Sequence, residues 1–145
     1  MKLQLLILAT LLTAALLTGG DQHPSVRYFG HEQVAAALAH GGSFVTEPDF
    51  LVSANHRAEA GHVEMHDKET DVFYITDGEA TFVTGGKIVG GRVSAPGQTV
   101  GTDIVGGEVH HLSKGDVIMI RAGVPHWFKE VPHSVSYFVV KVLKP

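Results

Sequence analysis

Short apolar runs follow one another through most of the chain, separated by polar and turn-forming residues. Each run is rich in β-branched or aromatic residues and is bounded by Gly, Asp, Pro or Ser, which is typical of β-strands. The runs recur about every eight to twelve residues, the spacing of an antiparallel sandwich or barrel. They are Val72–Ile75, Ala80–Thr84, Val109–Leu112, Val117–Ile120, Trp127–Lys129 and Val135–Val142. No helical pattern lies between these runs, which argues against a parallel α/β fold.

Two other segments complete the prediction of the fold. The segment His31–His40 has its apolar residues at helical spacing, and Gly41 and Gly42 follow it, as at a helix end. The glycine-rich stretch between Thr84 and Glu108 predicts two or three short strands joined by turns. The whole pattern predicts an all-β, single-domain antiparallel sandwich or barrel with a short N-terminal helix.

The first twenty residues differ from the rest of the chain. An apolar run from Leu3 to Leu17, with a lysine before it and small residues after it, has the order of a secretory signal peptide. The run is short for a membrane span, which needs about 20 residues, and no basic cluster follows it. We expect a signal peptide at 1–20, the helix and a lead-in at 21–50, and the barrel at 51–145. The protein would then be periplasmic or secreted, without stable membrane insertion after cleavage, and an uncleaved N-terminal anchor is the alternative.

Composition restricts the chemistry that the chain can perform. The formal net charge of −4 argues against a phosphate-binding surface, so we expect no nucleic-acid partner. Cysteine is absent, which excludes disulfides, thiolate zinc sites, iron–sulfur clusters and cysteine nucleophiles. Ten histidines are a high count for 145 residues. Any metal ion must therefore be held by nitrogen and oxygen ligands.

One strand-like segment carries three side chains that can bind a metal ion. Polar and apolar residues alternate from Gly61 onward, so in a strand His62, Glu64 and His66 project to one face. In a helix, His62 and His66 would share a face and Glu64 would point away. Gly61 and the β-rich surroundings favour the strand, and the HExxH pattern of zinc proteases is absent.

Two spaced patterns resemble the motifs of the cupin superfamily of small β-barrels. The first motif is His-x-His, three or four residues, Glu, six residues and Gly. Here its positions are taken by Glu64, His66, Asp71 and Gly78. The second motif is Gly, five residues, Pro-x-Gly, two residues and His. Here its positions are taken by Gly115, Arg121, Gly123 and His126. The resemblance covers roughly Val52 to Val142 and implies the cupin fold, an all-β antiparallel barrel of the jelly-roll type.

The resemblance also implies a metal site. Carried over position by position, the candidate ligands are Glu64, His66, Asp71 and His126, with His62 on the same face as a substitute for Glu64. Glu64 stands where the motif has its first histidine, and Asp71 stands where it has glutamate. Two imidazoles and two carboxylates are a plausible set for Mn²⁺, Fe²⁺, Ni²⁺ or Zn²⁺. A barrel that has lost its metal and uses the interior as a pocket is the open alternative.

Three further polar residues are candidates for simpler roles. Arg121 replaces the motif proline, and its guanidinium could clamp a carboxylate near the mouth of the barrel. His110 and His111 are neighbours in a strand, so one faces in and the other out. We expect one of them to be hydrogen-bonded and the other to be solvated.

The resemblance implies an exported metal-dependent enzyme that acts on an oxygen-rich small molecule. Dioxygenase-type oxidation and isomerase or lyase chemistry are both open, with Glu64 as the general base where it is not a ligand. The alternative is a non-catalytic module that binds a sugar or an organic acid, and a structural envelope protein is a third reading. A homodimer is expected because Val135, Tyr137 and Val139 would otherwise expose one face of an edge strand.

Overall fold

The computed structural model describes residues 25–144, so the predicted signal peptide at 1–20 lies outside the described residues. Within that range, no helix is long and apolar enough to cross a membrane. The elements in chain order are α1 (His31–His40), β1 (Gly42–Thr46), β2 (Phe50–Arg57), β3 (Val63–His66), β4 (Glu69–Thr84), β5 (Lys87–Val89), β6 (Arg92–Ala95), β7 (Gln98–Gly101), β8 (Asp103–Val105), β9 (Glu108–Ser113), β10 (Val117–Ile120), β11 (His126–Glu130) and β12 (Val135–Leu143).

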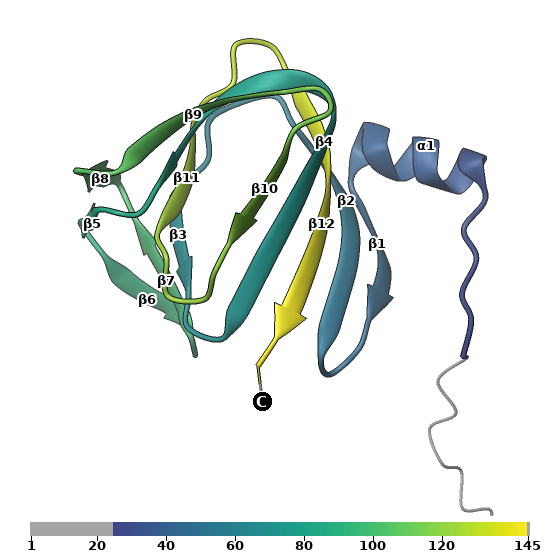
Figure 1. Ribbon diagram of the computed structural model, residues 1–145, viewed down its shortest axis with the longest axis horizontal. Helices are drawn as coiled ribbons and strands as arrows, with labels where there is room; N and C mark the ends of the chain where they lie inside the picture. The colour runs from purple at the N-terminus through teal and green to yellow at the C-terminus, as the bar shows by residue number, and fades with distance from the viewer. Residues whose placement is uncertain (1–24, 145) are drawn as a thin grey trace, which may run out of the picture.

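Helix α1 forms where the sequence predicts it. It begins after Gly30 and ends before Gly41, whose φ of 79° lies in the region that favours glycine. The helix lies against β2 and β12 on the outside of the barrel (Figure 1). The Ser136 hydroxyl of β12 donates a hydrogen bond of 3.1 Å to the carbonyl oxygen of Leu38. The helix therefore covers part of one sheet and takes no part in the barrel interior.

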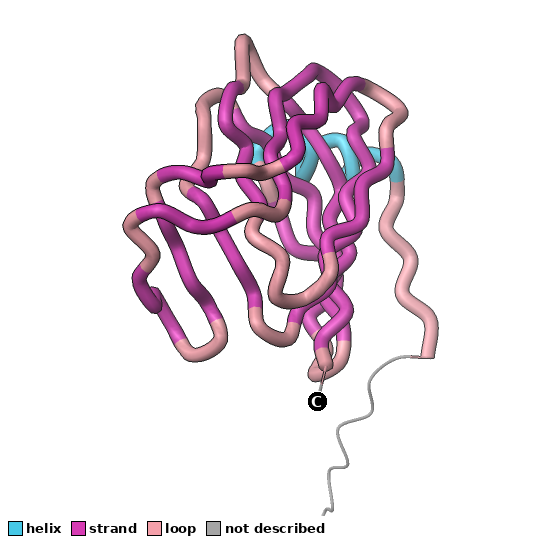
Figure 2. The backbone as a smooth tube through the Cα atoms, turned by 60° about the vertical axis from the view of Figure 1, so that its left-hand side comes forward, coloured by secondary structure: helices cyan, strands magenta, loops and turns pink. Residues whose placement is uncertain are grey.

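The strands form two antiparallel sheets that share β4 and wrap around a common interior. In one sheet the order is β1, β2, β12, β4 and β10, and in the other it is β9, β4, β11, β3, β7 and β6. The short strands β5 and β8 pair with each other at one end of the barrel (Figures 1 and 2). This architecture confirms the predicted all-β antiparallel barrel with one short helix.

The long strand β4 corrects one expectation. The sequence predicts two strands joined by a tight turn at residues 77–79, but the structure has one continuous strand from Glu69 to Thr84. Gly78, with φ of 76°, bends the strand without reversing it. The first part of β4 therefore pairs with β10 and β12, and the second part pairs with β9 and β11.

We predict that Gly78→Ala destabilises the protein far more than Gly85→Ala does. A Cβ at position 78 would lie 2.0 Å from the carbonyl oxygen of Ser134, whereas one at position 85 would meet nothing within 4 Å. Both glycines have positive φ, so each substitution costs about 1 kcal/mol from backbone strain. The clash adds about 2 kcal/mol at position 78 alone. Urea unfolding measures both, and equal losses of free energy would contradict the prediction.

The glycine-rich stretch holds four strands, where the sequence predicts two or three. Strands β6 and β7 form a hairpin, and β7 pairs with β3, so this stretch extends one sheet. Gly90 and Gly97 have positive φ and allow the chain to reverse after only a few residues. These closely spaced turns explain why the stretch contains more strands than the apolar pattern indicates.

The barrel interior holds the main apolar core. The rings of Phe82 and Phe128 have their centroids 4.7 Å apart. Val135, Tyr137 and Val139 belong to the same core and are at most 4% exposed. The expectation that these three residues form an exposed face is wrong, because β12 is a central strand between β2 and β4. Their side of β12 points into the barrel.

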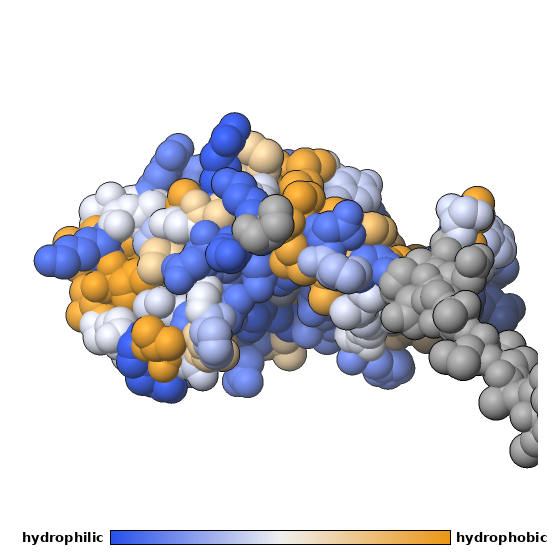
Figure 3. All heavy atoms as spheres, turned by 90° about the horizontal axis from the view of Figure 1, so that it is seen from below, coloured by the Kyte–Doolittle hydropathy of each residue, from blue (hydrophilic) through white to orange (hydrophobic). Residues whose placement is uncertain are grey.

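Apolar side chains also remain on the outside of the molecule. The alternate residues of β12 and its neighbours expose Tyr74, Val117, Met119, Val140 and Val142 on the outer face of one sheet. Seen from below, further apolar side chains gather at the left-hand end, over β5 to β8 (Figure 3). The apolar surface of the sheet therefore comes from the side of β12 opposite to the predicted one.

Candidate metal centre

Four of the predicted ligands meet inside the barrel. Strand β3 carries Glu64 and His66, β4 carries Asp71, and β11 brings His126 directly opposite Glu64. The Nε2 atoms of His66 and His126 lie 3.6 and 3.7 Å from Oδ2 of Asp71, and each lies 3.9 Å from Oε2 of Glu64. These distances are too long for hydrogen bonds. The four side chains therefore surround a common point without bonding to one another.

Both imidazoles leave one nitrogen without a partner. His66 Nε2 and His126 Nε2 are buried and have no hydrogen bond among the described residues. His126 Nδ1 lies 3.1 Å from the carbonyl oxygen of Val124, which can only accept, so Nδ1 carries the proton and Nε2 has the free lone pair. A buried polar atom without a partner costs about 1–3 kcal/mol, which a bound ion would offset.

Gln98 fixes the tautomer of the other imidazole, that of His66, in the same way. Its Nε2 donates a hydrogen bond of 2.6 Å to Glu69, so its Oε1 is oriented to accept the proton of His66 Nδ1. Strand β7 places Gln98 directly opposite His66 on β3. Sequence reasoning missed Gln98, because it lies in the glycine-rich stretch and its contact depends on the register of two distant segments.

Lys141 on β12 is a second residue that sequence reasoning missed. Its ammonium donates hydrogen bonds of 2.9 and 3.0 Å to the two oxygens of Asp71 and one of 2.8 Å to Glu69. Burial alone would lower the pKa of Lys141, but the two carboxylates raise it above its ordinary value. Burial alone would raise the pKa of Glu69, and the hydrogen bond and charge of Lys141 lower it instead. Lys141 therefore balances the carboxylate charge beside the imidazoles.

The donor set fits a divalent transition-metal ion. Ligand atoms of Glu64, His66 and His126 all lie within 4.8 Å of one another, and the same holds for His66, Glu69 and Asp71. This spacing is about twice the usual metal–ligand distance of about 2.0–2.2 Å. Burial lowers the pKa of His126, so its imidazole is neutral and able to bind a metal at neutral pH. The nitrogen and oxygen donors fit Mn²⁺, Fe²⁺, Ni²⁺ and Zn²⁺ alike.

The other predicted site residues lie apart from this cluster. His62 lines the same cavity but belongs to neither group of candidate ligands in the described part of the chain. Arg121 is exposed and lines a different hollow, beside His110, so the structure does not bring it together with the candidate ligands. Strand β10 ends at the buried Ile120, and Arg121 begins the loop that follows. His110 is hydrogen-bonded to Thr84 at 2.9 Å, and its neighbour in the strand is exposed.

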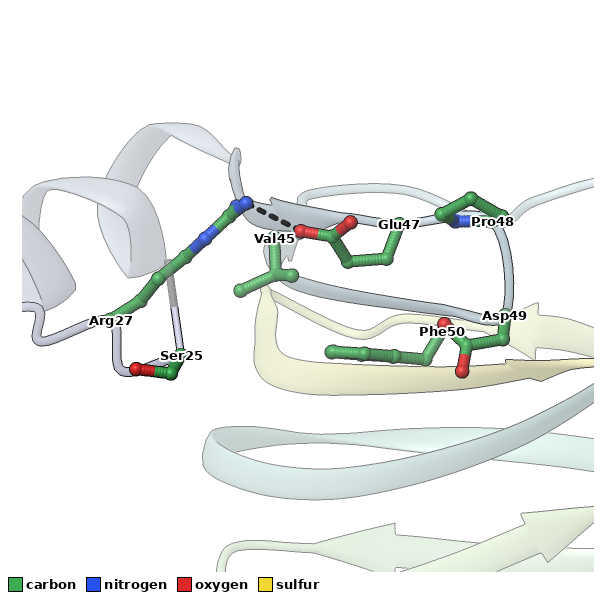
Figure 4. Close-up of a pocket in the computed structure, with 7 residues that line it drawn as sticks. All are labelled: Ser25, Arg27, Val45, Glu47, Pro48, Asp49 and Phe50. Carbon is green, nitrogen blue, oxygen red and sulfur yellow. Dashed lines mark hydrogen bonds and ion pairs between the residues drawn. The ribbon is translucent and has the colours of Figure 1, made fainter. Parts of the chain in front are cut away.

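A cavity of about 210 Å³ adjoins the cluster. Asp71 and His126 line it, together with aromatic side chains of β4, β11 and β12. A larger hollow, of about 470 Å³, lies outside the barrel between the N-terminal arm and the turn from β1 to β2 (Figure 4). Arg27 and Glu47 point toward each other there and form an ion pair, and no histidine lines that hollow. The interior cavity is therefore the one that adjoins the candidate ligands.

Comparison with solved structures decides the fold family. The chain is similar to the cupin domain of Cnp3 from Schizosaccharomyces pombe, with a TM-score of 0.52 and 12% identity over 72% of this chain and 60% of that one. It is also similar to a cupin superfamily protein of Desulfitobacterium hafniense, with a TM-score of 0.50 and 13% identity over 72% and 77% of the two chains. The chain has a cupin fold.

A third structural neighbour carries a named activity. The DMSP lyase DddQ of Ruegeria pomeroyi matches with a TM-score of 0.50 and 14% identity, over 71% of this chain and 46% of the lyase. No family model and no curated protein sequence matches the chain. The cupin fold of this protein therefore rests on structural similarity.

In this cupin barrel, we predict that Gln98→Ala weakens metal binding without abolishing it. The substitution removes the acceptor that orients His66 and leaves Glu69 with fewer hydrogen bonds. Loss of such an orienting partner typically lowers metal affinity about 10- to 100-fold. Competitive zinc titration against a chromophoric chelator measures the change. The exposed Gln33→Ala in α1 is the matched control, and equal affinities of the two variants would contradict the prediction.

Proposed function

We propose that this chain is a small metal-dependent enzyme that acts on an oxygen-rich small molecule inside the barrel. The observation that carries the proposal is the pair of buried Nε2 atoms of His66 and His126, which have no partner in the described residues and face the same two carboxylates. A divalent ion would supply the missing partner for both nitrogens and would neutralise the two carboxylates.

Bound at this cluster, a divalent ion supplies Lewis-acid stabilisation of substrate oxygens. Glu64 is the cluster carboxylate that substrate can reach, since its side chain is 40% exposed and that of Asp71 only 2%. Its free carboxylate oxygen would accept a proton from the substrate and return it. Phe73, Phe128 and Trp127 also line the cavity and provide apolar contacts for the carbon atoms of a substrate. Oxidation and isomerase or lyase chemistry are both compatible with this arrangement.

The second candidate function is a non-catalytic module that binds an organic acid or a sugar. The observation that favours it is that Lys141 donates hydrogen bonds to both oxygens of Asp71. The ammonium already balances the charge of this carboxylate, so the cavity can persist as a pocket without a metal ion. Both candidates use the same interior cavity.

Metal analysis followed by a substrate panel separates the two candidates. The purified protein is loaded with Mn²⁺, Fe²⁺, Ni²⁺ or Zn²⁺ and incubated with catechols, flavonols, hydroxy acids and sugar acids. Product formation that His126→Ala abolishes supports the enzyme. Thermal stabilisation by one of these compounds without any product supports the binding module, and failure to take up any of the four ions overturns metal dependence.

Export and self-association belong to the same proposal. The pattern of residues 1–20 supports a role in the periplasm or outside the cell, and N-terminal sequencing of the mature protein would locate a cleavage site. A homodimer stays a prediction that sedimentation velocity would measure. Tyr74 and Met119 on the outer face are 46% and 56% exposed and supply apolar area for such contact.

A further inference from the structure

Arg57, at the end of β2, is held in the wall of the interior cavity. Its Nε donates a hydrogen bond of 3.1 Å to the hydroxyl of Tyr137, and its Cζ lies 5.1 Å from the ring centroid of Phe128. Gly61 leaves room for the guanidinium, since a Cβ there would lie 2.9 Å from Nη1 of Arg57. The hydrogen bond and the aromatic ring fix the plane of the guanidinium, so little side-chain freedom remains to be lost on binding a ligand.

Among residues 25–144, Arg57 donates its one side-chain hydrogen bond through Nε, so its two terminal nitrogens have no partner there. Glu64 lines the same cavity but forms no ion pair with Arg57. In contrast, Arg27 in the outer hollow is paired with Glu47 (Figure 4). Two parallel N–H groups with nothing bound to them match the two oxygens of a carboxylate. The guanidinium of Arg57 is thus oriented in the cavity wall, and its two terminal nitrogens are available to bind an anion.

Tyr137 provides a second donor at the same place. Its hydroxyl accepts the hydrogen bond of Arg57 and has its own proton available. The residue is 4% exposed, and burial raises the pKa of Tyr137 above its ordinary value, so the phenol stays protonated and can donate. A ligand carboxylate held by Arg57 could therefore also accept a hydrogen bond from Tyr137.

The charges around the cavity make anion binding depend on the metal. The charged residues that line the cavity are Glu64 and Asp71, which are negative, and Arg57 and Lys141, which are positive, so their charges cancel. A divalent ion at the cluster changes this to two net positive charges. An anion is therefore held more strongly by the loaded cavity than by the metal-free one.

We propose that the cavity binds a small carboxylic acid that carries a second oxygen, such as a hydroxy or keto acid. Arg57 holds the carboxylate, and the second oxygen faces His66 and His126. The cavity of about 210 Å³ fits an acid of a few carbons, since drug-sized ligands occupy about 300–1,000 Å³. This inference rests on the proposed metal-dependent function and names its substrate class.

Calorimetric titrations in two stages test the inference. Zinc is first titrated into the wild type and into Arg57→Met, which keeps an unbranched side chain against Phe128 and removes the charge. Glycolate, lactate, glycerate and pyruvate are then titrated into both zinc-loaded proteins, with glycolamide and lactamide as uncharged controls. We expect Arg57→Met to bind zinc at least as tightly as the wild type, because a positive charge is removed, and to bind at least one acid about 10- to 100-fold more weakly.

The two stages distinguish the ways in which the inference can fail. If zinc binds and no acid does, the carboxylate site is wrong and the metal centre stands. If an acid binds equally to the wild type and to Arg57→Met, the metal alone holds it and the role of Arg57 is wrong. If neither protein binds zinc, the proposed metal-dependent function fails, and the carboxylate site fails with it because the second oxygen of the acid has no ion to face. Equal binding of lactate and lactamide also overturns the inference.

Discussion

His66→Ala and His126→Ala are each expected to lower zinc affinity by more than about 100-fold. Each substitution removes one of the two buried nitrogens that lack a partner in the described residues, and a residue that merely orients a ligand already contributes about 10- to 100-fold. Equilibrium dialysis of the wild type should give one zinc ion per chain. Either alanine variant should retain much less at the same free zinc concentration.

In the metal-free protein, each variant also removes a buried Nε2 atom that has no hydrogen-bond partner among the described residues. His126 is 4% exposed and His66 is 8% exposed, so each alanine leaves a small space in the interior of the barrel. His111→Ala is the matched control, because this histidine is exposed on β9 and lies outside the cluster. If His66→Ala and His126→Ala both retain one equivalent of zinc, the metal binds elsewhere.

Much of the fold follows from the sequence because local patterns decide it. The helix at His31–His40 and the strands β9 to β12 lie where apolar runs end at glycine, proline or polar residues. The bend of β4 could not be predicted in the same way. Asp77, Gly78 and Glu79 are typical of a tight turn, and only the close approach of Ser134 shows that the strand continues past them.

The spacing of the candidate ligands could also be predicted from the sequence. The residues that hydrogen-bond to the ligands or line the cavity beside them could not. The offsets between Glu64, His66 and Asp71 are local, and the second motif adds His126. Gln98 and Arg57 act through contacts with partners more than 30 residues away. Such contacts depend on strand register, which no local pattern in this chain reveals.

One signal for Lys141 was present in the sequence. Val135, Tyr137 and Val139 alternate with outward-facing residues, and Lys141 is the next residue of the inward series. A lysine in that position of a buried strand requires an acidic partner inside the barrel. The register pairs Lys141 directly with Asp71, which supplies it.

We predict that Lys141→Met destabilises the metal-free protein by about 3–5 kcal/mol and strengthens zinc binding. Removing one member of a largely buried ion pair leaves Asp71 as an uncompensated charge, because Lys141 donates to both of its oxygens. The same loss frees Asp71 for a cation and removes a repelling positive charge, so zinc affinity should rise about tenfold or more. Urea unfolding with chelator and with zinc measures both effects.

Lys114→Met is the control for the general effect of replacing a paired lysine. Its ammonium lies 3.8 Å from Asp77, and both side chains are more than 70% exposed, so the free energy of unfolding should change by less than about 1 kcal/mol. If Lys141→Met behaves like Lys114→Met, the buried ammonium does not balance the cluster. If Lys141→Met is destabilised and zinc does not restore its stability, Asp71 is not a metal ligand. Destabilisation that zinc reverses would show that Lys141 and the ion bind the same carboxylate in turn.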